Sequence, residues 1–470
     1  MAQLPRTLGA IHFVGIGGIG MSGIAEVLAT LGYTVRGSDM AESPNVERLR
    51  GLGIEIMIGH EAAHVAGVEV VVISSAVKAD NPEVMAARAA RIPVVRRAEM
   101  LAELMRLRWS IAVGGTHGKT TTTSLIAAIL DGAGLDPTVI NGGIIHAYGS
   151  NARLGEGPWA VAEADESDGT FTRLPATAAV VTNIDPEHLD HYGNFENVKA
   201  AFHTFVEQIP FYGFAAMCTD DPDVQALVAK VRDRRILTYG LNTQADITAR
   251  NLTVEKGVAK FDLLVRATGQ NTHEDAGEIS LAMPGKHNVQ NALGAIAVAE
   301  ALEIDREKMR AALAGFSGVA RRFTRAGAWK GATFIDDYGH HPVEVTAALS
   351  AAREAFDGRV IAVVQPHRYT RLQSLFDDFC RCMNDADQVL VAPVFAAGEA
   401  LIEGATHEDL ARGLVAHGHG NVTAMNGEGA EALAELVRDD LQEGDVVVCL
   451  GAGSVGRWAH DLQAVLEQGQ

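Results

Sequence analysis

A phosphate-binding loop is the clearest chemical signal in the sequence. Gly118, Lys119 and Thr120 stand between an apolar run at 111–113 and a segment with helical spacing of apolar residues. Backbone N–H groups of such a turn can bind phosphate oxygens, the Lys119 ammonium can neutralise them, and the Thr120 hydroxyl can hold Mg²⁺. The pattern predicts a nucleoside triphosphate site on a strand-loop-helix unit. The alternative is a Gly-rich turn with a surface lysine and N-capping threonines.

This loop is one residue tighter than the common nucleotide-binding pattern. That pattern has glycine five residues before the Gly of Gly-Lys-Thr, but Val113 stands there and the first glycine is Gly114. We expect the triphosphate to contact the whole loop, which consists of Gly114, Gly115, Thr116, His117, Gly118, Lys119, Thr120 and Thr121.

Polar residues follow three apolar segments that we expect to be strands, at 138–140, 159–162 and 178–181. Asn141 follows the first, the acidic run 163–168 the second, and Asn183 and Asp185 the third. The carboxyl ends of parallel strands share one edge of a sheet, so these groups are expected beside the phosphate loop, where carboxylates can hold Mg²⁺. His188 adds an imidazole near the same edge. A solvated acidic loop and a structural histidine are the alternatives.

A second glycine pattern, Gly15-x-Gly-x-x-Gly20, follows an apolar run at 11–14 and opens a helix. It predicts a pyrophosphate site, which NAD, FAD or a UDP-sugar would fit, with Asp39 suited to a ribose hydroxyl. The same spacing recurs at Gly451-x-Gly-x-x-Gly456. We interpret this C-terminal copy as a structural strand-helix connection.

Composition excludes several classes of protein. The chain has 470 residues, 47% of them hydrophobic, which is enough for several cores. The net charge of −20 opposes binding to nucleic acid or an anionic membrane. Four cysteines without paired spacing, no signal-peptide pattern and no apolar run of about 18 residues favour a soluble protein of the reducing cytoplasm.

The order of elements predicts an α/β protein of three domains: a Rossmann-like domain at 1–108, a phosphate-loop domain at 109–318 and a second Rossmann-like, doubly wound domain at 319–470. Further strands are expected at 33–36, 70–74 and 94–95 in the first domain. The central domain combines a parallel sheet with antiparallel hairpins, which the alternating pattern at 245–281 predicts, before an Ala-rich helix at 289–302. A basic, Gly-rich stretch at 315–325 is the expected linker. The third domain has expected strands at 333–335, 360–364, 388–391, 422–425 and 446–450, and the first two run into DDYGHHP and QPHRYTR.

Seven motifs in order, GTHGKTTT, EADESD, DPEHLDH, GKHNVQN, ARRF, DDYGHHP and QPHRYTR, make the whole chain resemble the Mur ligases. The resemblance implies an ATP-dependent ligase of peptidoglycan precursor synthesis that joins L-alanine to the carboxylate of UDP-N-acetylmuramate through an acyl phosphate, as a monomer or homodimer. A branch that adds a whole tripeptide is the nearest alternative. That branch has Phe-Ala where this chain has Tyr338-Gly339, which favours the alanine-adding branch.

The resemblance also implies roles for individual residues. Thr120 and Glu163 would hold one Mg²⁺ and His188 a second. Arg321 or Arg322 would reach the γ-phosphate, and of the two Arg322 is our candidate. His287, Asn288 and Asn291 would flank the adenine, and Asp337 the ribose. Catalysis would involve Lys119, His340, Arg322, Arg368 and Arg371. Substrates would contact Gly15, Gly17, Gly18, Gly20, Asp39, His60, Ser74, Ser75, Tyr338, His340, His367, Arg368 and Arg371.

Two other functions remain open from the residues alone. A nicotinamide-dependent oxidoreductase would use the Gly15 turn, but leaves the acidic run and QPHRYTR unexplained. A nucleotide-gated binding module without chemistry leaves the third domain unexplained.

Overall fold

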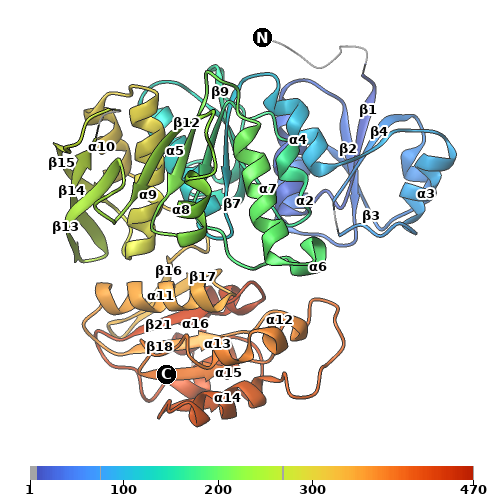
Figure 1. The fold of residues 1–470 in the computed structure, drawn as a ribbon. Helices are drawn as coiled ribbons and strands as arrows, with labels where there is room; N and C mark the ends of the chain where they lie inside the picture. Colours follow the sequence, from blue (N-terminus) through green and yellow to red (C-terminus); the bar gives the residue numbers. More distant parts are fainter. Residues whose placement is uncertain (1–7, 75, 267–268, 469–470) are drawn as a thin grey trace. The chain divides into compact units, whose positions relative to one another are not determined.

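The computed structural model describes residues 8–74, 76–266 and 269–468. Three β-sheets of five, ten and six strands form the framework of the chain, with helices packed beside them (Figure 1). By contacts between residues the chain divides into two compact units. The first runs to residue 250 and includes 262–279 and 290–317; the second contains 251–261, 280–289 and the chain from 318 onward. The predicted α/β class with parallel sheets and antiparallel hairpins is confirmed.

The first sheet has the order β3-β2-β1-β4-β5, and its neighbouring strands are all parallel. Ile11 and Phe13 of β1 pack into one apolar cluster and Val14 into another, because alternate residues of a strand point to opposite faces. The strands are β1 (Ala10–Val14), β2 (Val35–Asp39), β3 (Glu55–Ile58), β4 (Val68–Ile73) and β5 (Val94–Arg96). The helices are α1 (Ile19–Thr30), α2 (Pro44–Gly51), η1 (Ala62–Val65), α3 (Pro82–Ala89) and α4 (Arg97–Met105).

The second sheet has the order β15-β14-β13-β12-β11-β10-β6-β9-β7-β8. From β12 to β7 its strands are parallel, and β8 closes one edge antiparallel to β7. The strands are β6 (Trp109–Gly114), β7 (Thr138–Ile145), β8 (Ser150–Arg153), β9 (Trp159–Glu163), β10 (Ala178–Val181), β11 (Phe214–Cys218), β12 (Arg235–Gly240), β13 (Ile247–Glu255), β14 (Val258–Val265) and β15 (Glu274–Leu281). The helices are α5 (Lys119–Gly132), η2 (Thr170–Arg173), α6 (Leu189–Tyr192), α7 (Phe195–Glu207), α8 (Pro222–Val228), α9 (Lys286–Ala301) and α10 (Arg306–Ala314).

The third sheet has the order β16-β17-β21-β18-β19-β20, parallel except for the antiparallel edge strand β16. Its strands are β16 (Thr324–Trp329), β17 (Ala332–Asp337), β18 (Val360–Val364), β19 (Gln388–Val391), β20 (Val422–Ala424) and β21 (Val446–Leu450). Its helices are α11 (Pro342–Ala355), α12 (Tyr369–Ser374), α13 (Phe376–Phe379), α14 (His407–Ala416), α15 (Ala430–Val437) and α16 (Val455–Gln468).

The sequence did not predict five of these strands: β3, β8, β11, β12 and β16. Three of them, β3, β8 and β16, are sheet edges, where a strand needs no continuous apolar pattern because one side lacks a neighbouring strand. β11 is apolar but contains two alanines, which have low strand propensity. The strand predicted at 33–36 is β2, which begins at Val35.

In the part of the chain that the structure describes, no helix combines the length and apolar character needed to cross a bilayer.

Candidate active site

The phosphate loop joins β6 to α5 and contains two glycines with positive φ, Gly115 at +137° and Gly118 at +81°. A Cβ on Gly115 would lie 1.9 Å from Thr182 Oγ1, and one on Gly118 would lie 2.4 Å from Asn291 Oδ1. Both glycines are therefore required by backbone conformation and by close packing. Asn183 secures the loop, because its side-chain oxygen accepts a hydrogen bond of 2.7 Å from the His117 N–H.

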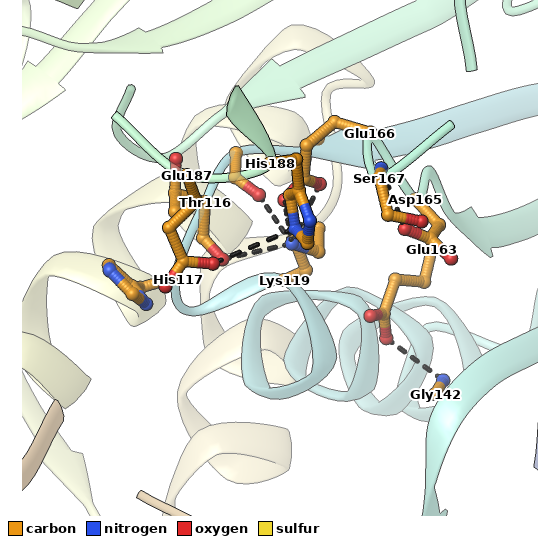
Figure 2. Close-up of polar contacts among 12 residues, drawn as sticks. Thr116, His117, Lys119, Gly142, Glu163, Asp165, Glu166, Ser167, Glu187 and His188 are labelled. Atoms are coloured by element: carbon orange, nitrogen blue, oxygen red, sulfur yellow. Dashed lines mark hydrogen bonds and ion pairs between the residues drawn. The ribbon is translucent and has the colours of Figure 1, made fainter. Parts of the chain in front are cut away.

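Lys119, the first residue of α5, turns back over this loop. Its Nζ donates to the carbonyl oxygens of Gly115 and Thr116 at 2.6 and 2.9 Å and lies 2.8 Å from Glu166 Oε2 (Figure 2). Burial alone lowers the pKa of Lys119, but the carboxylates of Glu166 and Glu163 outweigh it and raise this pKa. The ammonium is thus charged and oriented at the position where the triphosphate was predicted.

Thr120 and Glu163, which the resemblance assigns to one Mg²⁺, lie in contact at the end of β9. Glu163 Oε2 accepts a hydrogen bond of 2.9 Å from Thr120 Oγ1. The same oxygen accepts a second hydrogen bond of 2.9 Å from the Gly142 N–H (Figure 2). A Cβ on Gly142 would lie 2.4 Å from the same oxygen, so only glycine fits beside this carboxylate. A hydroxyl and a carboxylate that share one short contact are a donor set that fits Mg²⁺.

His188 precedes α6 in the left-handed conformation, with φ +56°, which is uncommon for a residue other than glycine. Its Nε2 lies 3.6 Å from both Glu166 Oε1 and Glu187 Oε2 (Figure 2). Burial lowers the pKa of His188, against the effect of nearby carboxylates, which favours a neutral imidazole able to bind a metal ion.

Glu166 was not among the predicted site residues, although it lies in the same acidic run as Glu163. Its side chain is 4% exposed and contacts both Lys119 and His188. Burial raises the pKa of Glu166 to about 7 despite the opposing charge of Lys119. The signal available in the sequence was its position three residues after Glu163, but spacing along a loop does not show which carboxylate faces the lysine.

The three residues predicted to flank the adenine lie in or beside α9. Asn291 belongs to the first unit, and its Oδ1 accepts a hydrogen bond of 3.2 Å from Thr122 Oγ1. His287 and Asn288 belong to the second unit. Burial lowers the pKa of His287 to about 4, so its ring is neutral at pH 7.

The Gly15 turn joins β1 to α1 and contacts the carboxylate that was predicted beside it. The Gly17 N–H donates to Asp39 Oδ2 at 2.8 Å, and a Cβ on Gly17 would lie 2.9 Å from that oxygen. Gly15 has φ +76°. Gly18 is the N-cap of α1, and Gly20 lies in the first turn of that helix. Ser74 follows β4, and its carbonyl oxygen accepts a hydrogen bond of 3.2 Å from the Val77 N–H. The predicted Ser75 lies outside the described residues.

His60 belongs to a buried cluster around Glu83 that the sequence analysis missed. Glu83 is fully buried and accepts from Ser38 Oγ at 2.7 Å, while His12 Nε2 and His64 Nδ1 lie 3.0 and 2.8 Å from its oxygens. His60 Nδ1 lies 3.1 Å from Ser38 Oγ and 3.4 Å from Glu83. Burial alone raises the pKa of Glu83, but the hydrogen bonds of this cluster outweigh it and bring the pKa down to about 2.

In the second unit Asp337, Tyr338 and His340 follow β17. The two carboxylate oxygens of Asp337 accept the N–H groups of Phe323 and Gly339 at 2.8 and 2.7 Å. Burial raises the pKa of Asp337 to about 6, although Arg322 opposes the shift. His340 Nδ1 lies 3.1 Å from the Tyr338 carbonyl oxygen.

The two linker arginines have different surroundings. Arg321 donates to the carbonyl oxygens of Gly451 and Gly453 at 2.5 and 3.3 Å, so it joins the segment before β16 to the C-terminal glycine turn. Both guanidinium carbons lie near the Tyr338 ring, that of Arg321 at 4.9 Å and that of Arg322 at 5.3 Å from its centre, and Arg322 Nη1 also lies 3.9 Å from Glu344 Oε1.

The C-terminal glycine turn is filled by a side chain. Gln365 Oε1 accepts from Val455 N–H at 3.1 Å, and a Cβ on Gly453 would lie 2.4 Å from the same oxygen. The position that a pyrophosphate would occupy is thus taken by glutamine, which supports a structural role for this turn.

His367, Arg368 and Arg371 lie together beyond β18. Arg371 Nη1 lies 3.4 Å from His367 Nδ1, and the His367 ring stands 6.0 Å from that of His340. The spacing of Arg368 and Arg371, three residues apart after an apolar run, predicts that both lie on one face of a first helical turn. This prediction is wrong for Arg368, because α12 begins at Tyr369 and Arg368 precedes it with φ +69°. Arg368 is held there by its N–H, which donates to the Phe395 carbonyl at 2.9 Å. The grouping of two guanidinium groups and two imidazoles can bind a small carboxylate.

Three family models match the chain in succession. They are the Mur ligase family catalytic domain over residues 10–109, the Mur ligase middle domain over residues 113–299 and the Mur ligase glutamate ligase domain over residues 321–453.

Curated relatives match almost the whole chain. A UDP-N-acetylmuramate--L-alanine ligase of Xanthobacter autotrophicus is 61% identical over 465 residues, covering 99% of this chain and 98% of the relative. A UDP-N-acetylmuramate--L-alanine ligase of Rhodospirillum centenum is 63% identical over 469 residues, covering 99% of this chain and 96% of the relative. Among solved structures, the UDP-N-acetylmuramate-alanine ligase of Thermotoga maritima has a TM-score of 0.83 at 29% identity, covering 98% of this chain and 100% of its own. A murein peptide ligase of Psychrobacter arcticus shares the fold, with a TM-score of 0.71 at 24% identity over 97% of this chain and 98% of its own.

Proposed function

Because the chain belongs to the Mur ligase family, we propose that it joins L-alanine to the carboxylate of UDP-N-acetylmuramate, with ATP converted to ADP and phosphate. The observation that carries this proposal is the match over 99% of the chain to relatives named for that reaction. The buried Lys119 at the phosphate loop supports the ATP-dependent chemistry.

The reaction needs activation because a carboxylate is a poor electrophile. An oxygen of the muramate carboxylate attacks the γ-phosphorus of ATP, ADP leaves, and an acyl phosphate forms. The alanine amine then attacks the acyl carbon, and phosphate leaves as the amide forms. Lys119 would neutralise the charge on the transferring phosphoryl group.

Mg²⁺ would be held by Thr120 and Glu163, and a second ion by His188; it would supply positive charge to the phosphate oxygens. The contact of 2.9 Å between Thr120 Oγ1 and Glu163 Oε2 supports the first site. The neutral state favoured for His188 supports the second. Glu166, between Lys119 and His188, would keep the lysine charged before the nucleotide binds.

The UDP pyrophosphate would bind at the Gly15 turn, with Asp39, His60, Ser74 and Ser75 beside it. Alanine would bind where His340, His367, Arg368 and Arg371 gather, since a guanidinium group pairs well with a carboxylate. Tyr338-Gly339 in place of Phe-Ala supports alanine over a tripeptide as the incoming group. We further propose domain boundaries after residues 108 and 318, a monomer or homodimer, and a cytoplasmic location, which the four buried free cysteines support.

Phosphate release tests the proposal. Purified protein is given ATP, Mg²⁺ and UDP-N-acetylmuramate with L-Ala, Gly, L-Ser or an L-Ala-headed tripeptide in separate reactions. We expect release to be fastest with L-Ala and absent without the UDP-sugar. Preference for the tripeptide would assign the recycling reaction instead, and nicotinamide fluorescence enhancement on mixing with NADH would favour an oxidoreductase.

A further inference from the structure

Asn151 of β8 is fully buried inside the first unit and contacts two segments far from it in sequence. Its Nδ2 donates to the Ile19 carbonyl at 2.6 Å, and the same nitrogen lies 3.4 Å from the Asn141 carbonyl oxygen. One amide therefore joins the first residue of α1 to β7 of the second sheet.

The α1 side of this contact is tightly packed. A Cβ on Gly23 would lie 2.8 Å from Asn151 Nδ2, so the helix can approach β8 only because residue 23 is glycine. Arg48 of α2 donates to Asn151 Oδ1 and to Ser150 Oγ, both at 3.0 Å, and its charge is paired with Glu26. These polar groups are buried or half-buried and satisfy one another, so separating the two segments would leave buried polar groups without partners.

The β7 side leads to the predicted magnesium site. Asn141 Nδ2 donates to Ser124 Oγ of α5 at 2.8 Å. The next residue, Gly142, donates its N–H to Glu163 Oε2 at 2.9 Å, and that oxygen also accepts from Thr120. A continuous series of hydrogen bonds and one peptide link thus runs from the Gly15 turn to the oxygen ligands proposed for Mg²⁺.

We propose that Asn151 is a positioning residue that couples binding of the UDP-sugar at the Gly15 turn to binding of Mg²⁺ and ATP at the phosphate loop. A displacement of α1 when its N-terminal turn binds the pyrophosphate is transmitted by the Asn151 amide to β7, and through Gly142 to Glu163. Because coupling between two sites is reciprocal, each ligand raises the affinity for the other by the same factor. This inference rests on the proposed function, since it requires a UDP-sugar at the first site.

Asn151→Asp tests the inference with little change of shape. It removes both amide donations and keeps the oxygen that accepts from Arg48. The dissociation constant of UDP-N-acetylmuramate is measured by calorimetry with and without Mg²⁺ and a non-hydrolysable ATP analogue. In the wild-type protein we expect the analogue to tighten binding at least about fivefold, the lower end of common coupling. In the variant we expect the analogue to change the dissociation constant of UDP-N-acetylmuramate by less than about twofold. Each ligand alone should bind the variant with a dissociation constant within about threefold of that for the wild-type protein.

Asn197→Asp is the matched control, because Asn197 also donates Nδ2 to a backbone carbonyl, that of Tyr192 at 2.6 Å, but is exposed. It should keep the wild-type coupling factor. Asn151→Ser is the second variant in case Asn151→Asp fails to fold: the shorter side chain adds no charge or clash beside Gly23, and it has a single hydroxyl donor in place of the amide that reaches both the Ile19 and the Asn141 carbonyls.

Coupling retained in a folded variant, or absent from a wild-type protein that binds both ligands, would overturn the role of Asn151. A wild-type protein that binds the ATP analogue but not the UDP-sugar would instead overturn the proposed function, and the inference with it.

Discussion

Lys119 and Glu166 form a buried ion pair, with 2.8 Å between Nζ and Oε2, inside a loop built to receive phosphate. The ammonium also donates to two backbone carbonyls of the same loop. The three contacts use all three hydrogens of the ammonium, so a triphosphate bound at this loop would compete with Glu166 for Lys119. Both the chemistry and the stability of this loop depend on that pair.

Lys119→Met should reduce kcat by about 10³-fold and leave UDP-sugar affinity within about twofold of wild type. The lost interaction acts mainly in the transition state, and groups of this kind contribute about 10²–10³-fold to kcat. Steady-state phosphate release and calorimetry with UDP-N-acetylmuramate measure the two effects. Lys199→Met, on the half-exposed side of α7, should behave as wild type. Activity within tenfold of wild type would contradict the assignment of the loop.

The ion pair should also be visible in stability. Lys119→Met leaves the buried Glu166 carboxyl without the cation that pairs with it. Adding Glu166→Gln replaces this unpaired carboxyl by a neutral amide. We expect the single variant to unfold at a temperature at least about 3 °C lower and the double variant to recover at least half of that loss. Scanning calorimetry of wild type, both single variants and the double variant measures the interaction. Purely additive shifts would mean that the two side chains do not stabilise each other.

Glu163→Ala and His188→Ala should each raise the Mg²⁺ concentration needed for half-maximal activity, by at least about fivefold. Loss of one oxygen or nitrogen ligand weakens metal binding, and a higher concentration restores occupancy. Titration of activity with Mg²⁺ at saturating substrates is the measurement. If activity and thermal stability fall together with no response to Mg²⁺, these side chains are structural only.

Glu83→Gln should make the protein less stable at pH 7, and the deficit should shrink in acid. The pKa of Glu83 is about 2 in the folded protein, against 4.5 for an ordinary glutamate such as that of the unfolded chain. The contribution of the Glu83 carboxylate to the free energy of unfolding is therefore complete above about pH 4.5 and is lost as the pH falls toward 2. Urea unfolding between pH 7 and pH 3 measures it. The difference in midpoint from wild type should be constant down to about pH 5 and decrease below it, and the exposed Glu103→Gln should show neither effect. A deficit that persists unchanged at pH 3 would contradict this origin.

Arg371→Lys should raise KM for L-alanine at least tenfold, equivalent to about 1.4 kcal/mol of binding. Lysine keeps the charge but cannot form two parallel hydrogen bonds to a carboxylate, and it loses the contact of 3.4 Å with His367. KM values for ATP and UDP-sugar should change by less than threefold, and Arg381→Lys on the exposed surface nearby should change none. Equal increases in KM for all three substrates would mean that Arg371 stabilises the fold and does not bind alanine. The alanine site would then be sought around His340.

The sequence by itself determined the features that depend on neighbouring residues. Gly115, Gly118 and Lys119 are close in the chain, and the conformation of a strand-loop-helix unit follows from glycine positions and the change from an apolar run to helical spacing. The position of the acidic run 163–168 beside the phosphate loop was also predictable, because strand tips of a parallel sheet meet at one edge. The resemblance to the Mur ligases, and not this rule, singled out Glu163 as the partner of Thr120. The edge strands β8 and β16 were not, since an edge carries no continuous apolar pattern.

Only the tertiary structure decided which side chains meet across long separations. Glu83 lies 71 residues from His12, and Asn151 lies 132 residues from Ile19, so no spacing rule joins them. Among similar neighbours, packing selected Glu166 as the partner of Lys119 and directed Arg321, which shares the Tyr338 ring with Arg322, to the Gly451 turn. Residue type specifies which contact a side chain can make, but the close packing of helices and sheets fixes which partner lies within reach.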